Sequence, residues 1–362
     1  MTHSDHREQF EDVVVSPGGV GELGEAPEEL RDVPRHDTAG TDRSALGERT
    51  RWFLSRYALV LVWIMMAGVF YTLRPDTFGR IAAFQSIFGS QSILVFLGVA
   101  ALVTLSVGEF DLSIASIAGL SATTVPVLVS GHHWNVAWAC ALALVMCLAC
   151  GAVNAFFVVK IGVASMVVTL GTGTFLVGIA EWISASSQVA INDPPFAKIS
   201  LYPVLDLPVS FYYGVALVLM LAYVRSWTPL GRHMLFVGAN REVARLAGVR
   251  VNRVRAGSYL VASVVAGFGG IMLVSSTGGF DASGSADYLL PALAAVFLGT
   301  AVVQPGQFNP IGMLIGIYFL ETGIFGLELL GYNGWVQDVF YGAGLVIAVA
   351  IATIVRIRAS RA

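Results

Sequence analysis

The chain has 362 residues, of which 56% are hydrophobic and only 12% are charged, and its mean hydropathy is +0.74. Soluble domains usually carry about 25% charged residues, so this composition excludes a water-soluble fold with a polar exterior. The charge is also uneven, because residues 1–50 have a net charge of −7 and residues 51–362 have a net charge of +4.

The first 50 residues form a segment of their own. They contain 12 of the 24 acidic residues and are rich in Gly and Pro. Such a segment buries too little apolar surface to offset the entropy lost on ordering. It also lacks the basic start, apolar core and cleavage site of a signal peptide. We therefore predict a disordered, acidic tail over 1–50 and a transmembrane domain over 51–362.

Long apolar runs follow the tail, and roughly 20 residues of helix cross the hydrocarbon core. The runs lie at 57–73, 87–107, 112–130, 136–158, 162–183, 209–225, 256–276, 288–303, 309–327 and 335–355. They predict an all-α integral membrane protein of about ten transmembrane helices. The run at 288–303 is short enough to be re-entrant. The fourth run holds all three cysteines, Cys140, Cys147 and Cys150, without a second pair of ligands, so we expect them to pack and expect no metal site.

Arginine placement sets the orientation. The segment 225–255 holds seven arginines and one acid, and further arginines precede the first run and follow the last. Cytoplasmic loops carry an excess of Lys and Arg, so 226–255 should be a cytoplasmic loop. An even number of crossings then places both termini in the cytoplasm. Glycines at 267, 269, 270, 312 and 316 favour close helix packing.

The cytoplasmic loop contains a predicted short helix. Asn240 is suited to cap its start, Arg241 to Leu246 form the helix, and Gly248 can end it in a left-handed conformation. Such a helix can transmit a push from a soluble partner, although an Arg-rich loop can also serve only to fix orientation. The residues alone leave both readings open.

Acidic residues at membrane depth are costly and therefore suggest function. Glu109 and Asp111 interrupt an otherwise continuous apolar stretch, and Glu181 and Glu321 are expected near the outer interface. Asp111 is suited to cap a helix that begins near Leu112. Glu109 could either snorkel to the cytoplasmic interface or have a functional role at membrane depth.

Three ordered motifs resemble the permeases of ribose, xylose and galactose-type bacterial ATP-binding-cassette importers. The loop is similar to their coupling loop at Leu230, Gly231, Arg232, Gly238, Asn240, Ala244, Gly248 and Val251, and departs from it at Val237 and Val243. The segment 108–117 resembles G-G-I-D-L-S-V-G-S-I, with Glu109 in place of Gly. The segment 290–300 resembles L-D-A-I-A-A-V-x-L-G-G-T, with Pro291 in place of Asp. The likeness covers about 57–356.

The resemblance implies a permease subunit of an ATP-driven importer in the bacterial cytoplasmic (inner) membrane, carrying a monosaccharide or related polyol into the cytoplasm. It implies cytosolic ATPase subunits, an external solute-binding protein and a second permease copy or paralogue as partners, and no nucleic acid. The chain has no G-x-x-x-x-G-K-[ST] loop, so we expect no enzymatic activity and no cofactor of its own, with ATP bound by partner subunits. Nucleosides or branched-chain amino acids remain alternative substrates, and a secondary transporter driven by an ion gradient remains the rival class.

The resemblance also assigns residues. Those expected to couple to the ATPase are Gly231, Arg232, Gly238, Asn240, Arg241, Glu242, Ala244, Arg245 and Gly248. Those expected along the translocation path are Glu109, Phe110, Asp111 and Ser113. The substitution Ala244→Arg is expected to abolish uptake while leaving membrane insertion intact.

Overall fold

The fold was taken from a computed structural model, which describes the backbone of residues 41–359 and the side chains of residues 56–350. The predicted disorder of residues 1–40 lies outside this range. Helix α1 begins at Thr41, ten residues before the predicted boundary of the transmembrane domain. The chain divides between Glu48 and Arg49, and the description below concerns Arg49–Ala362.

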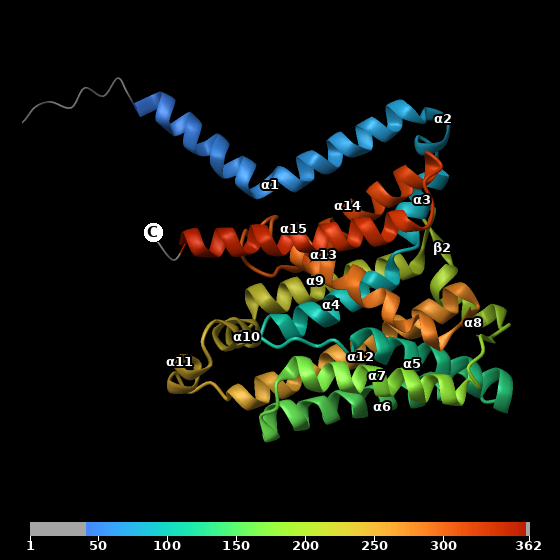
Figure 1. Cartoon of the computed structure of the whole chain (residues 1–362). Coiled ribbons are helices and arrows are strands. Elements are labelled where there is room, and N and C mark those ends of the chain that lie inside the picture. The colour runs from blue at the N-terminus through green and yellow to red at the C-terminus, as the bar shows by residue number, and fades with distance from the viewer. Residues whose placement is uncertain (1–40, 360–362) are drawn as a thin grey trace, which may run out of the picture. The chain divides into compact units, whose positions relative to one another are not determined.

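Helices make up nearly all of the described chain (Figure 1). In the first half they are α1 (Thr41–Leu73), α2 (Pro75–Phe78), α3 (Ile81–Gly89), α4 (Ser92–Leu105), α5 (Ile114–Pro126), α6 (Val136–Ala155), α7 (Ser165–Ile183) and α8 (Pro194–Leu201). In the second half they are α9 (Val209–Trp227), α10 (Pro229–Ala239), α11 (Arg241–Leu246), α12 (Val251–Thr277), α13 (Leu289–Gly299), α14 (Pro310–Leu329) and α15 (Trp335–Ala359). Two π-helical turns, Val127–Gly131 and Phe156–Ile161, extend α5 and α6, and a 3₁₀ segment, η5 (Ala282–Tyr288), precedes α13.

All ten predicted apolar runs coincide with helices. Nine helices in the described part of the chain are long and apolar enough to cross a membrane, and Trp335–Ala350 is a shorter tenth. Two of these crossings are interrupted: Ser90 and Gln91 separate α3 from α4, and the crossing Ala282–Gly299 joins the 3₁₀ segment η5 to α13. Helix α13 has 11 residues, a length of about 16 Å, which is about half of the hydrocarbon core. The 3₁₀ segment η5 supplies the other half, so the predicted short run at 288–303 is a half-length α-helix.

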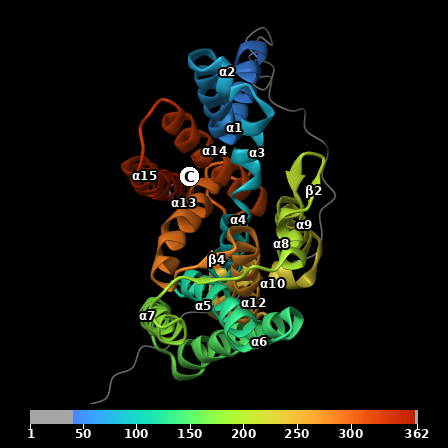
Figure 2. The same ribbon diagram turned by 90° about the vertical axis from the view of Figure 1, so that its right-hand side faces the viewer.

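The core is built around α4, which lies beside α12 in Figures 1 and 2. All 14 residues of α4 are buried, so this helix is covered by protein on every side. Helix α12 contacts α4, α5 and α6. The predicted close packing at glycines is confirmed: a Cβ atom at Gly269 would lie 2.9 Å from Cβ of Phe96, and one at Gly316 would lie 2.6 Å from the carbonyl oxygen of Ala295.

Four two-residue strands complete the fold. Strand β1 (Val189–Ala190) pairs antiparallel with β4 (Gly279–Phe280), and β2 (Pro203–Val204) pairs antiparallel with β3 (Leu207–Pro208). Both pairs lie beyond the end of α12 that is opposite α11 (Figure 1). They are therefore at the outer end of the bundle, since α11 belongs to the cytoplasmic loop.

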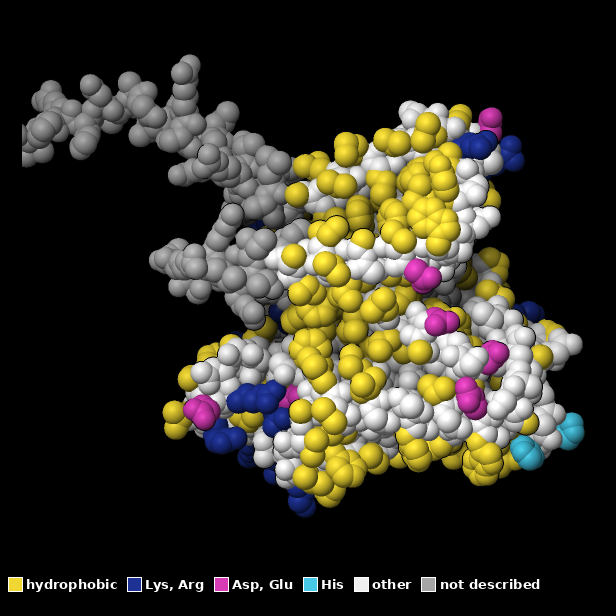
Figure 3. Space-filling view, in the orientation of Figure 1, with side chains coloured by type: hydrophobic (Ala, Val, Ile, Leu, Met, Phe, Trp, Pro, Cys, Tyr) yellow, Lys and Arg dark blue, Asp and Glu magenta, His cyan; other side chains and the backbone are white. Residues whose placement is uncertain are grey.

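Side chains of different kinds gather at different places on the surface. Figure 3 shows the largest group of Lys and Arg side chains at the end that holds α10 and α11, and several acidic side chains toward the other end. A broad hydrophobic surface lies between them. Helix α15 ends on the same side as α10 and α11 (Figure 1). By the positive-inside rule this side is cytoplasmic.

Candidate functional site: a cytoplasmic ion-pair cluster and an outer cavity

The cytoplasmic loop folds into two capped helices. The hydroxyl of Thr228 accepts a hydrogen bond from the amide of Gly231 at the start of α10. The side chain of Asn240 accepts hydrogen bonds from the amides of Glu242 (2.9 Å) and Val243 (3.1 Å) at the start of α11. Gly248 has a φ of +82°. The predicted cap, helix and left-handed glycine are therefore confirmed.

The predicted coupling residues divide into two groups. Gly231 and Ala244 are buried, and Arg241 is half-buried, so these residues hold the loop onto the bundle. Gly238 is exposed, but it belongs to the same group because a Cβ atom there would overlap the carbonyl oxygen of Ser106 at the end of α4. The others, Arg232, Asn240, Glu242, Arg245 and Gly248, are exposed.

The exposed side of α11 carries apolar residues. Leu246 is 89% exposed and Val243 is 52% exposed, and Ala247 beside them is also exposed. Single exposed apolar residues are common on any protein, but here two of them project from a short helix at the cytoplasmic end. Ala244, by contrast, is fully buried. An arginine at Ala244 would disrupt the packing of the loop itself, so Ala244→Arg cannot separate folding from coupling as expected from the sequence.

The four predicted path residues lie in a break between α4 and α5. Gly108 turns the chain with a φ of +74°, and residues 109–113 are not helical. Backbone groups of the break are satisfied by α7, because the amide of Leu112 donates to the hydroxyl of Thr169 at 3.0 Å and that hydroxyl contacts the carbonyl of Phe110. Irregular backbone is tolerated at membrane depth only where protein or water covers it.

Glu109 is buried in this break and paired with two arginines. Its Oε1 lies 2.8 Å from Nη2 of Arg241 on α11 and 2.5 Å from Nε of Arg255 on α12. The hydroxyl of Tyr259 lies 3.4 Å from Oε2. The same Nη2 of Arg241 also donates to the carbonyl of Gly108. Of the two readings left open by the sequence, snorkelling is wrong, since the Glu109 side chain is only 2% exposed.

The two arginines that pair with Glu109 differ in exposure. The side chain of Arg241 is 41% exposed and that of Arg255 is 13% exposed. Exposed pairs stabilise a protein by about 0–1 kcal/mol, whereas removing one partner of a buried pair costs ~3–5 kcal/mol. Arg255 is therefore the partner that keeps a buried charge at Glu109 tolerable, and Arg241 can separate from Glu109 at a small cost.

Asp111 and Ser113 form a second polar group in the break. Oδ1 of Asp111 accepts hydrogen bonds from the amide (3.0 Å) and the hydroxyl (2.6 Å) of Ser113, and the amide nitrogen of Asn154 donates to the same hydroxyl at 2.8 Å. Helix α5 begins at Ile114, two residues later than predicted. Asp111 lies three residues before α5 begins, which is too early in the chain to cap the first turn. Its side chain instead holds the conformation of Ser113, the residue immediately before the helix.

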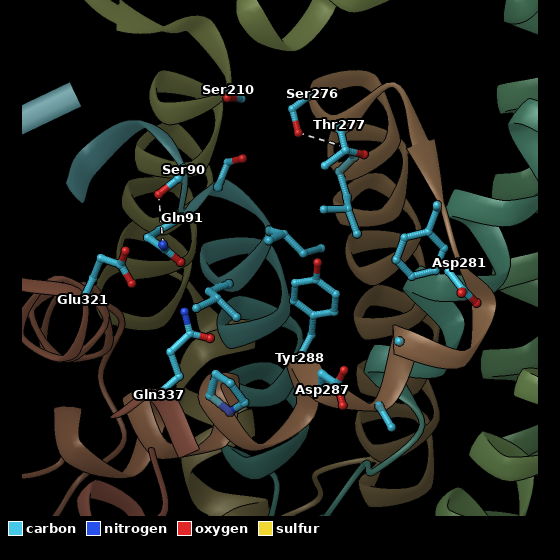
Figure 4. Close-up of a pocket in the computed structure, with 18 of the residues that line it drawn as sticks. Ser90, Gln91, Ser210, Ser276, Thr277, Asp281, Asp287, Tyr288, Glu321 and Gln337 are labelled. Carbon is cyan, nitrogen blue, oxygen red and sulfur yellow. Dashed lines mark hydrogen bonds between the residues drawn. The ribbon is translucent and has the colours of Figure 1, made fainter. Parts of the chain in front are cut away.

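A cavity of about 1090 Å³ lies at the outer end of the bundle. The elements around it are the ends of α3, α8 and α12, the starts of α4, α9, α13 and α15, the segments β4 and η5, and Glu321 of α14. Figure 4 shows Glu321, Gln91 and Gln337 on one side, Thr277 and Asp281 on the opposite side, and Tyr288 between them. None of the four predicted path residues lines this cavity.

The cavity is polar and acidic. Its lining includes the hydroxyl and amide groups of Ser90, Gln91, Ser92, Gln188, Ser210, Ser276, Thr277, Tyr288, Gln337 and Tyr341. It also includes four carboxylates, Asp281, Asp287, Glu321 and Asp338, and no Lys, Arg or His among the described residues. The hydroxyl and amide of Ser283 hold the pKa of Asp281 below its usual value. The cavity can therefore donate and accept hydrogen bonds, and it disfavours anions.

Sequence reasoning missed this cavity because its lining is spread over residues 89 to 341. One signal was available. Glu321 lies inside the apolar run 309–327, where a carboxylate is costly, and the sequence placed it only near the outer interface. The pairing of Glu109 with Arg241 and Arg255 was also missed, since it joins residues 132 and 146 positions apart.

Comparison with known proteins identifies the family. The model of the branched-chain amino acid transport system permease component family matches residues 83–349. The chain belongs to this permease family. It is accordingly a transport protein that crosses the cytoplasmic membrane several times, as its apolar helices indicate.

Named relatives of this permease align along most of its length. The L-arabinose ABC transporter permease protein AraH of Azospirillum brasilense is 25% identical over 90% of this chain and 96% of its own. The autoinducer 2 import system permease protein LsrD of Photorhabdus laumondii is 28% identical over 84% and 92%. The ribose import permease protein RbsC of Escherichia coli is 27% identical over 83% and 94%. No solved structure matches the permease.

Proposed function

We propose that the permease is the membrane-spanning subunit of an ATP-driven importer that carries a neutral monosaccharide or related polyol into the cytoplasm. The outer cavity carries this proposal. Its hydroxyl, amide and carboxylate groups suit a ligand rich in hydroxyl groups, and its volume of about 1090 Å³ is ample for one monosaccharide. The relatives named above for arabinose, autoinducer 2 and ribose support this substrate class over branched-chain amino acids.

The energy for transport has to come from a partner, since the sequence contains no phosphate-binding loop of the Walker type. We place a cytosolic ATPase subunit on the exposed apolar surface at α11, which consists of Val243 and Leu246 on the helix and Ala247 directly after it. An external solute-binding protein would deliver the solute to the outer end, where the cavity lies. A second permease copy or paralogue would complete the path.

An ion-gradient mechanism has less support from the geometry. A secondary transporter needs intramembrane acids that can exchange ions or protons. Glu109 is instead neutralised by two arginines. Asp111 accepts two hydrogen bonds from Ser113 through Oδ1, and its buried Oδ2 is the one oxygen of these two carboxylates that an exchanging ion or proton would have to use. The relatives called ABC transporter permeases favour the ATP-driven class.

Uptake by the source organism tests the proposal. Cells lacking the gene, and cells complemented with it, are given radiolabelled L-arabinose, D-ribose or leucine. We expect the deletion to abolish uptake of a sugar and to leave leucine uptake unchanged. Arsenate, which depletes ATP, should stop the sugar uptake, and a protonophore in cells that retain ATP should not. Loss of leucine uptake alone, unchanged uptake of both sugars, or inhibition by the protonophore alone would each contradict the proposal.

A further inference from the structure

Glu109 joins three parts of the permease that are distant in sequence. It lies in the break between α4 and α5, it is paired with Arg241 at the first position of α11, and it is paired with Arg255 on the first turns of α12. Helix α11 carries the exposed apolar side chains Val243 and Leu246. The ion pair with Arg241 joins Glu109 to α11. A displacement of α11 therefore acts on the α4–α5 break first at Glu109.

The two arginines hold Glu109 from different supports. Arg255 belongs to a 27-residue helix in the core, and its side chain is 13% exposed. Arg241 belongs to a six-residue helix at the surface, and its side chain is 41% exposed. Because Arg255 still neutralises the carboxylate when Arg241 leaves, the Glu109–Arg241 pair can open and close without leaving an unpaired buried charge.

The residue after Glu109 contacts the helix that leads to the cavity. The ring of Phe110 stacks on the ring of Phe297 in α13, with ring centroids 6.4 Å apart and an interplanar angle of 22°. Two turns earlier on α13, Leu290 and Pro291 line the outer cavity. Since Glu109 and Phe110 are adjacent, the break cannot shift at Glu109 without also shifting the ring that packs on α13.

We propose that Glu109 is the coupling residue of this permease, and that it does not contact the solute. The Glu109–Arg241 pair opens when an ATPase subunit displaces α11, and the α4–α5 break then moves α13 through the Phe110–Phe297 contact. The inference rests on the proposed function, because it requires a partner that pushes on α11. It adds the residue that receives the push and the route to the cavity.

A double-mutant cycle tests the pair. The variants Glu109→Gln, Arg241→Gln and the double variant are compared for initial uptake of the sugar that wild-type cells accumulate. Each single variant should lower uptake about tenfold, and the double variant should be no worse than either, because the two residues act through one contact. Arg253→Gln removes a charge from the same region at an exposed position, without an ion pair among the described residues, and should stay within about twofold of wild type.

Thermal denaturation of the purified variants separates coupling from folding. Arg241→Gln and Arg253→Gln should unfold at the same temperature, although only Arg241→Gln loses uptake. Single effects that add in the double variant, or a loss of uptake matched by a lower unfolding temperature in Arg241→Gln, would overturn the inference. A wild type whose uptake does not require ATP would instead overturn the proposed function.

Cross-linking tests the displacement of α11 from Glu109 without a measurement of sugar uptake. Cysteines replace Glu109 and Arg241, or Glu109 and Arg255, in a chain whose three native cysteines are alanine. Membranes from the source organism are treated with a short bifunctional thiol reagent, with and without Mg-ATP and vanadate. The trapped state should lower cross-linking of the first pair at least about threefold and leave the second unchanged. Equal cross-linking of the first pair in both states would refute the inference.

Discussion

At the cytoplasmic end, the carboxylate of Glu109 is buried between Arg241 and Arg255. At the outer end, Glu321 and three aspartates line a cavity that has no basic side chain among the described residues of its lining. The first arrangement neutralises charge and ties elements together, whereas the second leaves charge and hydrogen-bonding groups free to meet a solute. Carboxylates therefore serve attachment at one end and, under the proposed function, recognition of the solute at the other.

The largest expected difference between the two ends concerns removal of a carboxylate. Glu109→Leu leaves Arg255 buried without its partner and should lower the free energy of unfolding by ~3 kcal/mol. Glu321 has no ion-pair partner among the described residues, so Glu321→Leu should change the free energy of unfolding by less than ~1 kcal/mol. The same change should reduce sugar uptake. Thermal denaturation in detergent and uptake assays measure both. A larger loss of stability in Glu321→Leu would contradict the comparison.

Packing should also separate the ends. A side chain at Gly238 would overlap the backbone of Ser106, so Gly238→Val should cost ~1–3 kcal/mol and abolish uptake. Gly284 borders the cavity, and a Cβ atom there would meet only Oδ2 of Asp287, at 3.9 Å. Gly284→Ala should therefore have little effect on the unfolding temperature. A larger loss of stability in Gly284→Ala than in Gly238→Val would show that the cytoplasmic end is not the more tightly packed end.

The surface of α11 gives a smaller change in stability. Leu246→Asp alters a side chain that is 89% exposed, so it should shift stability by no more than ~0.5 kcal/mol. It should nevertheless lose the ATPase subunit during purification and lose uptake, because the apolar contact is replaced by a charge. Arg253→Gln, exposed on α12, is the control change outside the expected coupling residues. If the ATPase subunit still copurifies with Leu246→Asp, the docking surface does not lie on this face of α11.

The smallest effect is expected at Asp281. The pKa of Asp281 lies below its usual value because Ser283 donates a hydrogen bond to it. The stabilising contribution of this carboxylate is therefore fully present above the ordinary Asp pKa of about 3.9, and it is lost as the pH falls through the lower pKa of the folded state. The difference in unfolding temperature between wild type and Asp281→Asn should thus be constant from about pH 5 to 8. It should shrink only below about pH 4. A difference that changes near neutral pH would contradict this assignment.

The sequence predicted the membrane-crossing helices because each is a long apolar run, and it predicted α11 because Asn240 and Gly248 have local conformational preferences. It did not predict the short helices α2, α8 and α10. It also located the break at 108–111, where an acidic pair interrupts an apolar stretch. Contacts between distant elements could not be predicted in this way. Nothing in the spacing of Glu109, Arg241 and Arg255 indicates that they meet, and the cavity lining has no periodicity at all.

The burial of α4 has a consequence for synthesis. Helix α4 emerges long before α12, and yet Gly269 of α12 packs directly against Ile93 and Phe96 of α4. Until that later helix is inserted, one side of α4 can face only lipid or the insertion machinery. The permease core therefore closes late in translation, and chains that stop after α9 would be expected to leave α4 uncovered and to be degraded by membrane proteases.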